Sequence, residues 1–462
     1  MLYDLIVLGG GPAGCHGAEF AAKRGLRVAL FEENALGGVC LNEGCIPTKT
    51  MLHSARLFDR ANGGDARYGV ASTASLDHAA VTARKVKVVR TLSAGIAAKL
   101  RTAEVEVVKR RARIAGKSGD GFTVAADGEE YAAKRLLICT GSEAFVPPVP
   151  GMAEAFASGF AATSREMLAL SAVPEKLIVL GGGVIGLELA SYFRSAGSDV
   201  TVVEMLDRIG GPADPEMAKM LRAILQKRGM KFLLSTKAVG VGKGALTVEN
   251  ADGVQELAAD KLLVAVGRRA RTSGLGLETL GIRTERGAIA TDEHLRTGVP
   301  GVWAAGDVNG RSMLAHTASR EAEVAVRDMS GETDAMDYDA IPWVLYSDPE
   351  ISGVGLSEAE AAARGMECRI LKLPLRYSGR YVAENEGGNG FLKLTVASDG
   401  RILGGAMIGT PGSEIIFGIT MAVALRLTCA ELTRVVFPHP TVGEVFREAA
   451  FELEAENRFP AR

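Results

Sequence analysis

The chain has 462 residues, which is too long to fold around one hydrophobic core and predicts roughly three or four domains. Hydrophobic residues make up 47% and charged residues 23% of it, and the formal net charge of -2 gives no reason to expect nucleic-acid binding or attraction to an anionic membrane. Six cysteines in a chain of this length do not resemble a secreted disulfide framework and no leader-like segment is apparent, so the expected location is cytoplasmic.

Two stretches of the sequence, Leu5–Glu32 and Leu177–Glu204, repeat each other without a gap. Each has the pattern of a dinucleotide-binding unit: an apolar strand, a glycine turn, a helix, and a second strand that ends in glutamate. The first glycine permits the tight turn, the second lets backbone approach a pyrophosphate, and the third lets helix pack on strand. The carboxylate can accept hydrogen bonds from ribose hydroxyls. The first copy contains Gly9, Gly11, Gly14 and Glu32, and the second copy contains Gly181, Gly183, Gly186 and Glu204.

The second copy lies in an apolar run, Leu177–Phe193, that is nearly long enough to cross a bilayer. Glycines and Glu188 interrupt this run, which favours a nucleotide-binding loop over a membrane span. Two complete copies predict two sites, for two dinucleotides or for one dinucleotide and a flavin dinucleotide. Glu204 would repel the 2′-phosphate of NADP, and no arginine follows it directly, so the sequence favours NAD.

Three further apolar runs end in glycine, as buried parallel strands do, at 136–142, 262–268 and 302–308. Asp307, in the last of them, could cap a following helix and do nothing more.

A basic run at 109–113 follows alternating residues and predicts a solvated strand edge rather than a nucleic-acid site. From Ile341 onward short alternating strands and amphipathic helices replace the glycine turns, which predicts a separate α+β domain with another task.

Cys40 and Cys45 lie in the segment GGVCLNEGCIPTK. A zinc site would need further ligands, which no second cysteine pair or nearby histidine cluster supplies, and two unrelated core cysteines are another alternative. A redox disulfide requires the pair to leave regular helix, because five helical residues rise about 7.5 Å and a bridge permits roughly 7 Å between Cα atoms. Gly44 can supply an irregular turn. Pro47 suits the first turn of a helix, so we expect Cys45 at or just before a helix N-terminus, where a thiol pKa falls.

The cysteine segment, the two glycine turns, the AAGD segment at 304–307 and HPTVGE at 439–444 together resemble the pyridine nucleotide–disulfide oxidoreductases. The resemblance covers essentially the whole chain in the family's order. It implies an α/β fold with two Rossmann-like domains, which bind FAD and NAD, and a C-terminal α+β dimerisation domain. The implied domains are 1–150 (first part of the FAD-binding domain), 151–275 (NAD-binding), 276–340 (central, completing the FAD site) and 341–462 (dimerisation).

The resemblance also implies which residues contact the cofactors. The first copy of the repeat would hold the adenosine half of FAD, Asp307 would meet the ribitol, and the second copy would hold NAD. Glu188 lies inside an apolar helix and therefore needs a partner, and the resemblance supplies Lys49, as an ion pair beside the flavin. The remaining cofactor positions are Gly116 and Ala315 as lesser FAD contacts, Thr140, Gly141 and Gly306 at the strand ends, and Gly267 beside NAD.

His439 and Glu444 are the other residues to which the resemblance gives a role. A lone histidine is more often structural. In the family that the chain resembles, however, the histidine that matches His439 is the base for the substrate dithiol, and the glutamate that matches Glu444 orients the histidine ring. The partner subunit would contribute this dyad, which implies a homodimer, with Cys40 toward substrate and Cys45 toward flavin. The implied activity is oxidation of dihydrolipoyl groups by NAD, on a lipoyl domain of a 2-oxoacid dehydrogenase complex or on a glycine-cleavage carrier protein. An NAD(P)H-dependent reductase of a low-molecular-weight disulfide is the alternative.

Overall fold

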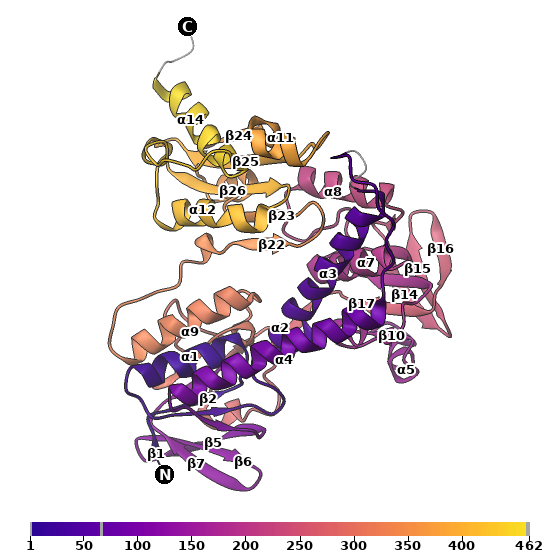
Figure 1. Ribbon diagram of the computed structural model, residues 1–462. Coiled ribbons are helices and arrows are strands. Elements are labelled where there is room, and N and C mark those ends of the chain that lie inside the picture. The colour runs from indigo at the N-terminus through magenta and orange to yellow at the C-terminus, as the bar shows by residue number, and fades with distance from the viewer. Residues whose placement is uncertain (1, 65–67, 459–462) are drawn as a thin grey trace.

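In the computed structural model, residues 2–64 and 68–458 are described, and three five-stranded sheets organise them (Figure 1). Two of these sheets are parallel and contain the two copies of the sequence repeat, one in each. The third is antiparallel and belongs to the C-terminal part of the chain. This arrangement confirms the predicted class, two Rossmann-like units followed by an α+β unit.

The first parallel sheet joins residues from distant parts of the chain. Its central strand β2 (Leu5–Leu8) is buried along its whole length, as expected for a short apolar run covered on both faces. The helix α1 (Pro12–Lys23) connects β2 to β3 (Val28–Phe31), and together they form the first copy of the repeat. The sheet order is β21-β8-β2-β3-β4, where β4 is Glu106–Val108, β8 is Leu136–Ile138 and β21 is Val302–Ala304.

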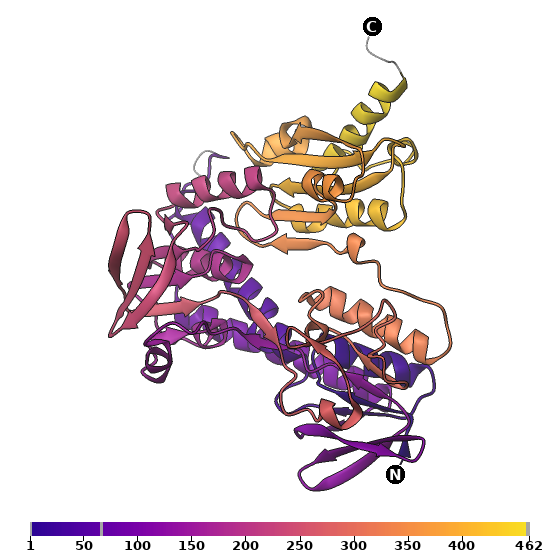
Figure 2. The same ribbon diagram turned by 180° about the vertical axis from the view of Figure 1, so that it is seen from behind.

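Helices cover one face of this sheet and a small second sheet lies beyond the other. α9 (Ala315–Met329) lies beside α1, and α4 (His78–Thr102) runs from the first unit to the second (Figure 1). The side chain of Asp77 accepts a hydrogen bond from the Ala80 N–H and caps α4. The small sheet, at the N-terminal end in Figure 2, consists of β1 (Leu2–Tyr3), β5 (Ala112–Ser118), β6 (Gly121–Ala126) and β7 (Glu129–Ala133).

The second parallel sheet contains the second copy of the repeat. In it β11 (Lys176–Leu180) leads through α7 (Val184–Ser195) to β12 (Asp199–Val203), and α7 is buried along most of its length. The N-terminal half of α4 and the helix α3 (Cys45–Asp59) pack against this unit and share its apolar core, while the first parallel sheet has apolar clusters of its own. The remaining strands of this sheet are β10 (Ala161–Ala162), β13 (Lys231–Leu233) and β17 (Lys261–Val264). A separate three-stranded sheet consists of β14 (Lys237–Gly242), β15 (Ala245–Asn250) and β16 (Gly253–Ala258), and the other helices of the unit are α5 (Met152–Ala157), α6 (Ser164–Leu168) and α8 (Pro215–Lys227).

The C-terminal unit is an antiparallel sheet with helices on its faces. β25 (Phe391–Ala397) and β26 (Ile402–Ile408) form a hairpin at its centre, in the region of the predicted alternating strands. The helices α12 (Gly412–Ala424) and α14 (Glu444–Arg458) supply the predicted amphipathic elements and pack on it. The other strands are β22 (Trp343–Leu345), β23 (Ile351–Gly355) and β24 (Cys368–Pro374), in the order β22-β23-β26-β25-β24.

Candidate active site

The first glycine turn has a different steric environment at each of its three glycines. Gly9 has a φ of +103°, and a Cβ there would stand 2.3 Å from the carbonyl oxygen of Cys139. A Cβ at Gly14 would stand 1.8 Å from the carbonyl oxygen of Gly9. A Cβ at Gly11 would meet nothing within 4 Å, so the space beside it is open. The turn and the helix packing therefore require Gly9 and Gly14, while Gly11 faces space at the N-terminus of α1, where a pyrophosphate fits.

The second glycine turn repeats this environment. Gly181 has a φ of +108°, and a Cβ at Gly186 would stand 2.1 Å from its carbonyl oxygen. Gly183, like Gly11, has nothing within 4 Å of its Cβ position. Two open spaces of the same form, each at the N-terminus of a helix, support two dinucleotide sites.

The glutamates at the ends of the two repeats are held in the same way. Glu32 Oε2 accepts a hydrogen bond of 2.7 Å from the Gly10 N–H, and Glu204 Oε2 accepts one of 2.6 Å from the Gly182 N–H. The second oxygen of each accepts a backbone N–H two residues further on. Each carboxylate is thus fixed beside its glycine turn, at the position where ribose hydroxyls would donate to it.

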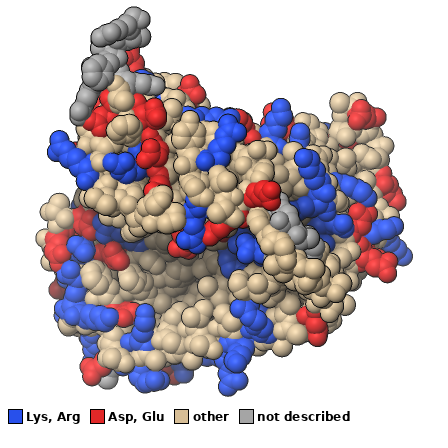
Figure 3. All heavy atoms as spheres, turned by 45° about the horizontal axis from the view of Figure 1, so that its top comes forward, with Lys and Arg blue, Asp and Glu red and all other residues tan. Residues whose placement is uncertain are grey.

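A cavity of about 1000 Å³ extends from the first glycine turn to the cysteine pair and lies between all three units of the fold. Figure 3 shows the surface hollowed between the C-terminal unit and the first unit. The basic run at 109–113 follows the edge strand β4 and is largely exposed, as predicted, and two of its residues, Arg110 and Arg111, also border the cavity. The predicted site residues that line it are Gly9, Gly11, Glu32, Cys40, Cys45, Lys49, Thr140, Gly141, Glu188, Gly306, Asp307 and Ala315.

The other predicted cofactor residues lie outside this cavity. Gly116 is at an irregularity in β5, and no part of the cavity lining includes it. The glycines of the second turn, Glu204 and Gly267 lie along the second sheet instead, although Val184 and Ile185 of α7 reach the cavity. The cavity therefore suits an elongated group on the first unit whose far end meets the second unit.

The cysteine pair occupies a break between two helices. Cys40 lies in α2 (Gly38–Glu43), and Cys45 is the first residue of α3. Gly44, between them, has φ -145° and ψ -105°, far from helical values, and Pro47 lies in the first turn of α3. The prediction that the pair leaves regular helix at Gly44 is confirmed, as is the position of Cys45 at a helix N-terminus.

The two thiols differ in their electrostatic surroundings. Neither cysteine is bridged, and the Cys40 thiol donates a hydrogen bond to the Cys45 sulfur. This bond lowers the pKa of Cys45 to about 7, with help from the Lys49 ammonium and against the effect of burial. The same bond and burial raise the pKa of Cys40. The position of Cys45 at the N-terminus of α3 acts in the same direction as the Lys49 charge, so the surroundings favour thiolate on Cys45 rather than on Cys40.

Lys49 and Glu188 form the ion pair that burial of the glutamate requires. Lys49 Nζ lies 2.6 Å from Glu188 Oε2, and the Glu188 side chain is only 3% exposed. The other carboxylate oxygen accepts a hydrogen bond of 3.1 Å from the Tyr346 N–H. Lys49 Nζ also lies 4.4 Å from the centroid of the Tyr346 ring. The sequence contained no local signal for Tyr346, which reaches the site from the end of β22.

Asp307 is part of a hydrogen-bonded chain rather than a helix cap, since α9 is preceded by Leu314 at its cap position. Its carboxylate accepts a hydrogen bond of 2.5 Å from the Ser142 hydroxyl. Arg268 Nε donates to the same hydroxyl at 2.7 Å, and burial lowers the pKa of this arginine. Sequence reasoning missed Ser142 and Arg268 as site residues, although each lies beside a residue that it had selected.

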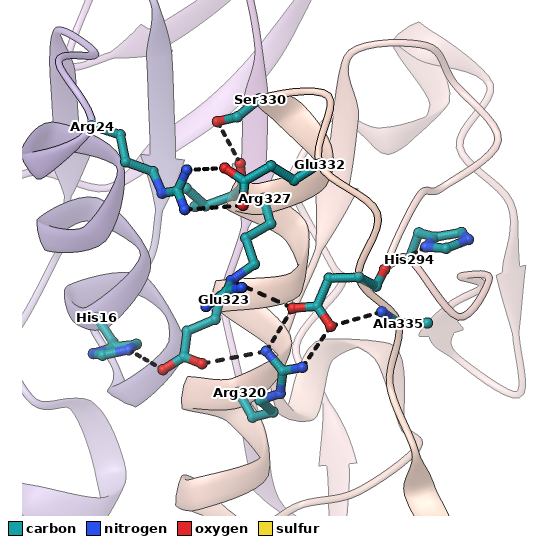
Figure 4. Close-up of polar contacts among 11 residues, drawn as sticks. His16, Arg24, His294, Arg320, Glu323, Arg327, Ser330, Glu332 and Ala335 are labelled. Atoms are coloured by element: carbon teal, nitrogen blue, oxygen red, sulfur yellow. Dashed lines mark hydrogen bonds and ion pairs between the residues drawn. The ribbon is translucent and has the colours of Figure 1, made fainter.

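An ion-pair network on the outer side of α1 and α9 fixes these two helices against each other (Figure 4). His16 Nε2 lies 2.8 Å from Glu323 Oε1, and Arg24 pairs with Glu332. Asp334 accepts from both terminal nitrogens of Arg320, at 2.6 and 2.8 Å. Because α1 begins at the first glycine turn and α9 follows the Asp307 loop, these partly exposed pairs join the two segments that carry the first nucleotide site.

His439 and Glu444 form a dyad, but away from the cysteine pair. His439 Nδ1 lies 2.9 Å from Glu444 Oε1, and the Thr441 N–H donates to the other oxygen at 2.8 Å. These two bonds, with the backbone bond the stronger, lower the pKa of Glu444. The His439 side chain is 77% exposed and does not line the cavity. One chain therefore carries the dyad on its surface.

Comparison with known proteins identifies the family. The model described as pyridine nucleotide-disulphide oxidoreductase matches residues 3–322, and the model of that family's dimerisation domain matches 341–450. The chain belongs to this family of disulfide oxidoreductases. Two curated relatives are a dihydrolipoyl dehydrogenase of Thermus scotoductus, 37% identical, and dihydrolipoyl dehydrogenase 3 of Pseudomonas aeruginosa, 38% identical, each aligned over 98% of both chains.

Solved structures of other disulfide oxidoreductases have the same fold. LpdA from Mycobacterium tuberculosis superposes with a TM-score of 0.88 at 27% identity, over 97% of this chain and 99% of that one. The HOCl-induced flavoprotein disulfide reductase RclA from Escherichia coli gives 0.84 at 28% identity, with the same coverage. The family is FAD-dependent and uses NAD, so FAD and NAD are the cofactors of this chain.

Family membership also bears on assembly. Residues 341–450 form a dimerisation domain, which supports the predicted homodimer. Among residues 2–64 and 68–458, no helix combines the length and the apolar character needed to cross a bilayer.

Proposed function

We propose that this protein is a dihydrolipoyl dehydrogenase, which oxidises protein-bound dihydrolipoyl groups to lipoyl and reduces NAD to NADH. The observation that carries the proposal is the position of the cysteine pair: Cys40 in α2 and Cys45 at the N-terminus of α3 line a cavity that reaches the first glycine turn, beside the Lys49–Glu188 ion pair. Relatives with this name align with almost the whole chain, which supports the choice of substrate.

The substrate reacts with the oxidised pair, a Cys40–Cys45 disulfide. One substrate thiol gives its proton to His439 of the partner subunit, and the thiolate attacks Cys40 Sγ. The disulfide breaks, a mixed disulfide forms on Cys40, and Cys45 leaves as thiolate. The second substrate thiol then attacks the mixed disulfide, which closes the lipoyl ring and returns its proton to Cys40. The substrate loses two electrons and the cysteine pair gains them.

Residues around the pair stabilise each charge that forms. Lys49 and the N-terminus of α3 stabilise the Cys45 thiolate, and the ion pair with Glu188 holds Lys49 in place. Glu444 orients His439 and stabilises its imidazolium. Bound FAD would supply the acceptor for the electron pair of the dithiol and the donor of a hydride to NAD.

The sites of cofactor binding follow the two glycine turns. Gly9, Gly11 and Glu32 would hold the adenosine half of FAD, and Asp307 its ribitol. The second turn, Glu204 and Gly267 would hold NAD, while Gly116 remains a predicted minor contact outside the cavity. The lipoyl group would be carried by a 2-oxoacid dehydrogenase complex or a glycine-cleavage carrier protein, in the cytoplasm. The domain boundaries at 150, 275 and 340 stay predictions.

One assay tests this proposal against its alternative, an NAD(P)H-dependent reductase of a low-molecular-weight disulfide. The structural likeness to a flavoprotein disulfide reductase gives that alternative its support. We expect NADH-driven reduction of lipoamide to exceed NADPH-driven reduction of glutathione disulfide in the purified holoprotein. Faster reduction of glutathione disulfide would overturn substrate and cofactor preference together. Cys45→Ser should abolish NAD-linked oxidation of dihydrolipoamide; full activity of that variant would overturn the thiol mechanism.

A further inference from the structure

Tyr346 touches both members of the buried ion pair beside the cysteines. Its backbone N–H donates to Glu188 at 3.1 Å, and its ring lies under Lys49 Nζ, 4.4 Å from the ring centroid. It also lines the cavity, and burial raises the pKa of its hydroxyl. Among the described parts of the chain, no other residue of the C-terminal unit hydrogen-bonds to this ion pair or stacks on it.

The peptide that carries Tyr346 is held on two sides. Glu188, on α7, accepts from its N–H, while Arg56, on α3, donates to the carbonyl oxygens of Tyr346 at 3.1 Å and Ser347 at 2.9 Å. The same guanidinium lies 3.2 Å from the carboxylate of Glu350. Since α3 begins at Cys45, one helix holds the reactive cysteine at its first residue and this peptide near its end. The ring is thus carried on a backbone fixed relative to the cysteine.

We propose that the ring of Tyr346 is a positioning group for Lys49, which it holds beside Cys45 by a cation–π contact. Glu188 fixes one side of the ammonium, but the lysine stem is long and has several rotatable bonds, so one contact leaves the ammonium free to shift away from Cys45. An aromatic face on another side of the ammonium opposes that motion. The C-terminal unit, which carries the dimerisation surface, thereby completes the redox centre of its own chain. The inference rests on the proposed redox role of Cys45.

The effect can be measured on the Cys45 thiolate itself. The groups that face this sulfur are Cys40, Lys49 and Glu188, with more distant contributions from Arg268 and Tyr346. Of these, Lys49 lowers the pKa of Cys45 by its charge, so loss of its fixed position should raise that pKa. The backbone bond from Tyr346 to Glu188 survives a side-chain substitution, which isolates the ring.

The experiment uses holoprotein with Cys40→Ser, which leaves one reporter thiol at the site. The rate at which iodoacetamide alkylates Cys45 is followed across pH by peptide mass spectrometry, and its midpoint gives the thiolate pKa. We expect Tyr346→Leu to raise this pKa by roughly 0.5–1 unit. Tyr346→Phe, which keeps the ring, should retain the midpoint of the parent. An unchanged midpoint in the leucine variant, or equal shifts in both variants, would overturn the proposal.

A matched control separates this effect from general destabilisation. Phe391 makes the same type of contact, with its ring centroid 4.3 Å from Lys372 Nζ, but in the C-terminal sheet and outside the cavity lining. Phe391→Leu should lower thermal stability without moving the alkylation midpoint of Cys45; a similar shift there would overturn the specific role of Tyr346. Alkylation needs no lipoyl substrate, so failure of the parent protein to oxidise dihydrolipoamide would count against the proposed function alone.

Discussion

Removal of one partner from the Lys49–Glu188 pair should cost far more than removal of a partner from an exposed pair. Breaking a buried pair costs about 3–5 kcal/mol, because the remaining charge stays buried without compensation. Lys49→Met leaves the carboxylate of Glu188, which is 3% exposed, with the Tyr346 N–H as its one donor among residues 2–64 and 68–458. Since Lys49 itself is 32% exposed, we reduce the expected cost to about 2–4 kcal/mol.

Glu188→Gln should cost less than Lys49→Met. The glutamine keeps the shape of the side chain, and the ammonium that remains has access to water. The double variant, with neither charge, should recover much of the loss, because no buried ion remains without a partner. The order of stability is therefore wild type, Glu188→Gln, and then Lys49→Met.

Thermal unfolding of the three variants, at one fixed FAD concentration, measures this order. Lys49→Met should lower Tm by roughly 2–4 °C, because an unfolding entropy of about 2.1 cal/mol/K per residue over 462 residues makes 1 kcal/mol equal to about 1 °C. The control is Lys237→Met, which breaks an exposed 2.8 Å pair with Glu249, in which the two side chains are 59% and 43% exposed. An exposed pair contributes about 0–1 kcal/mol, so its Tm should barely move. Equal losses in Lys49→Met and Lys237→Met would refute the argument from burial.

Three further outcomes are expected. Gly183→Ala should fold normally, because its Cβ meets only open space, but it should weaken NAD binding at least about tenfold. Gly186→Ala should instead lower Tm, because its Cβ would stand 2.1 Å from the Gly181 carbonyl oxygen. Equal NAD dissociation constants for wild type and Gly183→Ala would contradict this expectation. Removal of the Glu204 carboxylate with Glu204→Ser should lower the ratio of kcat/KM for NAD over NADP by about tenfold or more, and an unchanged ratio would argue against ribose recognition. The alkylation rate of reduced Cys45 should fall as pH drops through about 7, because the thiolate is lost on protonation; a rate independent of pH between 6 and 8 (roughly one unit each side) would contradict the assignment.

Sequence reasoning succeeded where the chemistry is local. The glycine turns, their glutamates and the break at Gly44 each depend on a few consecutive residues, and the structure gives them the geometry that their spacing requires. The need of Glu188 for a partner was also predictable, because a carboxylate in an apolar helix is costly without one.

The residues that the sequence did not reveal reach the site from distant parts of the chain. Tyr346 touches a lysine and a glutamate that belong to two other units of the fold, and no periodicity or motif links the three. Ser142 and Arg268 join Asp307 through strand pairing between β9 (Ser142–Ala144) and β18 (Arg268–Ala270), a register that only the folded chain defines. Such contacts depend on topology rather than on local residue pattern.

The position of β21 at the edge of the first sheet has a consequence for biosynthesis. While the ribosome makes the chain, β8 has no neighbour on that side until residues 302–304 emerge. The second parallel sheet, whose strands lie between Ala161 and Leu233 and at Lys261–Val264, is complete before then. A nascent or truncated chain that ends before residue 302 thus presents an open strand edge, the type of surface on which chains aggregate. Interruption of translation in this interval should therefore yield insoluble fragments and recruit chaperones, whereas the second nucleotide unit can already fold.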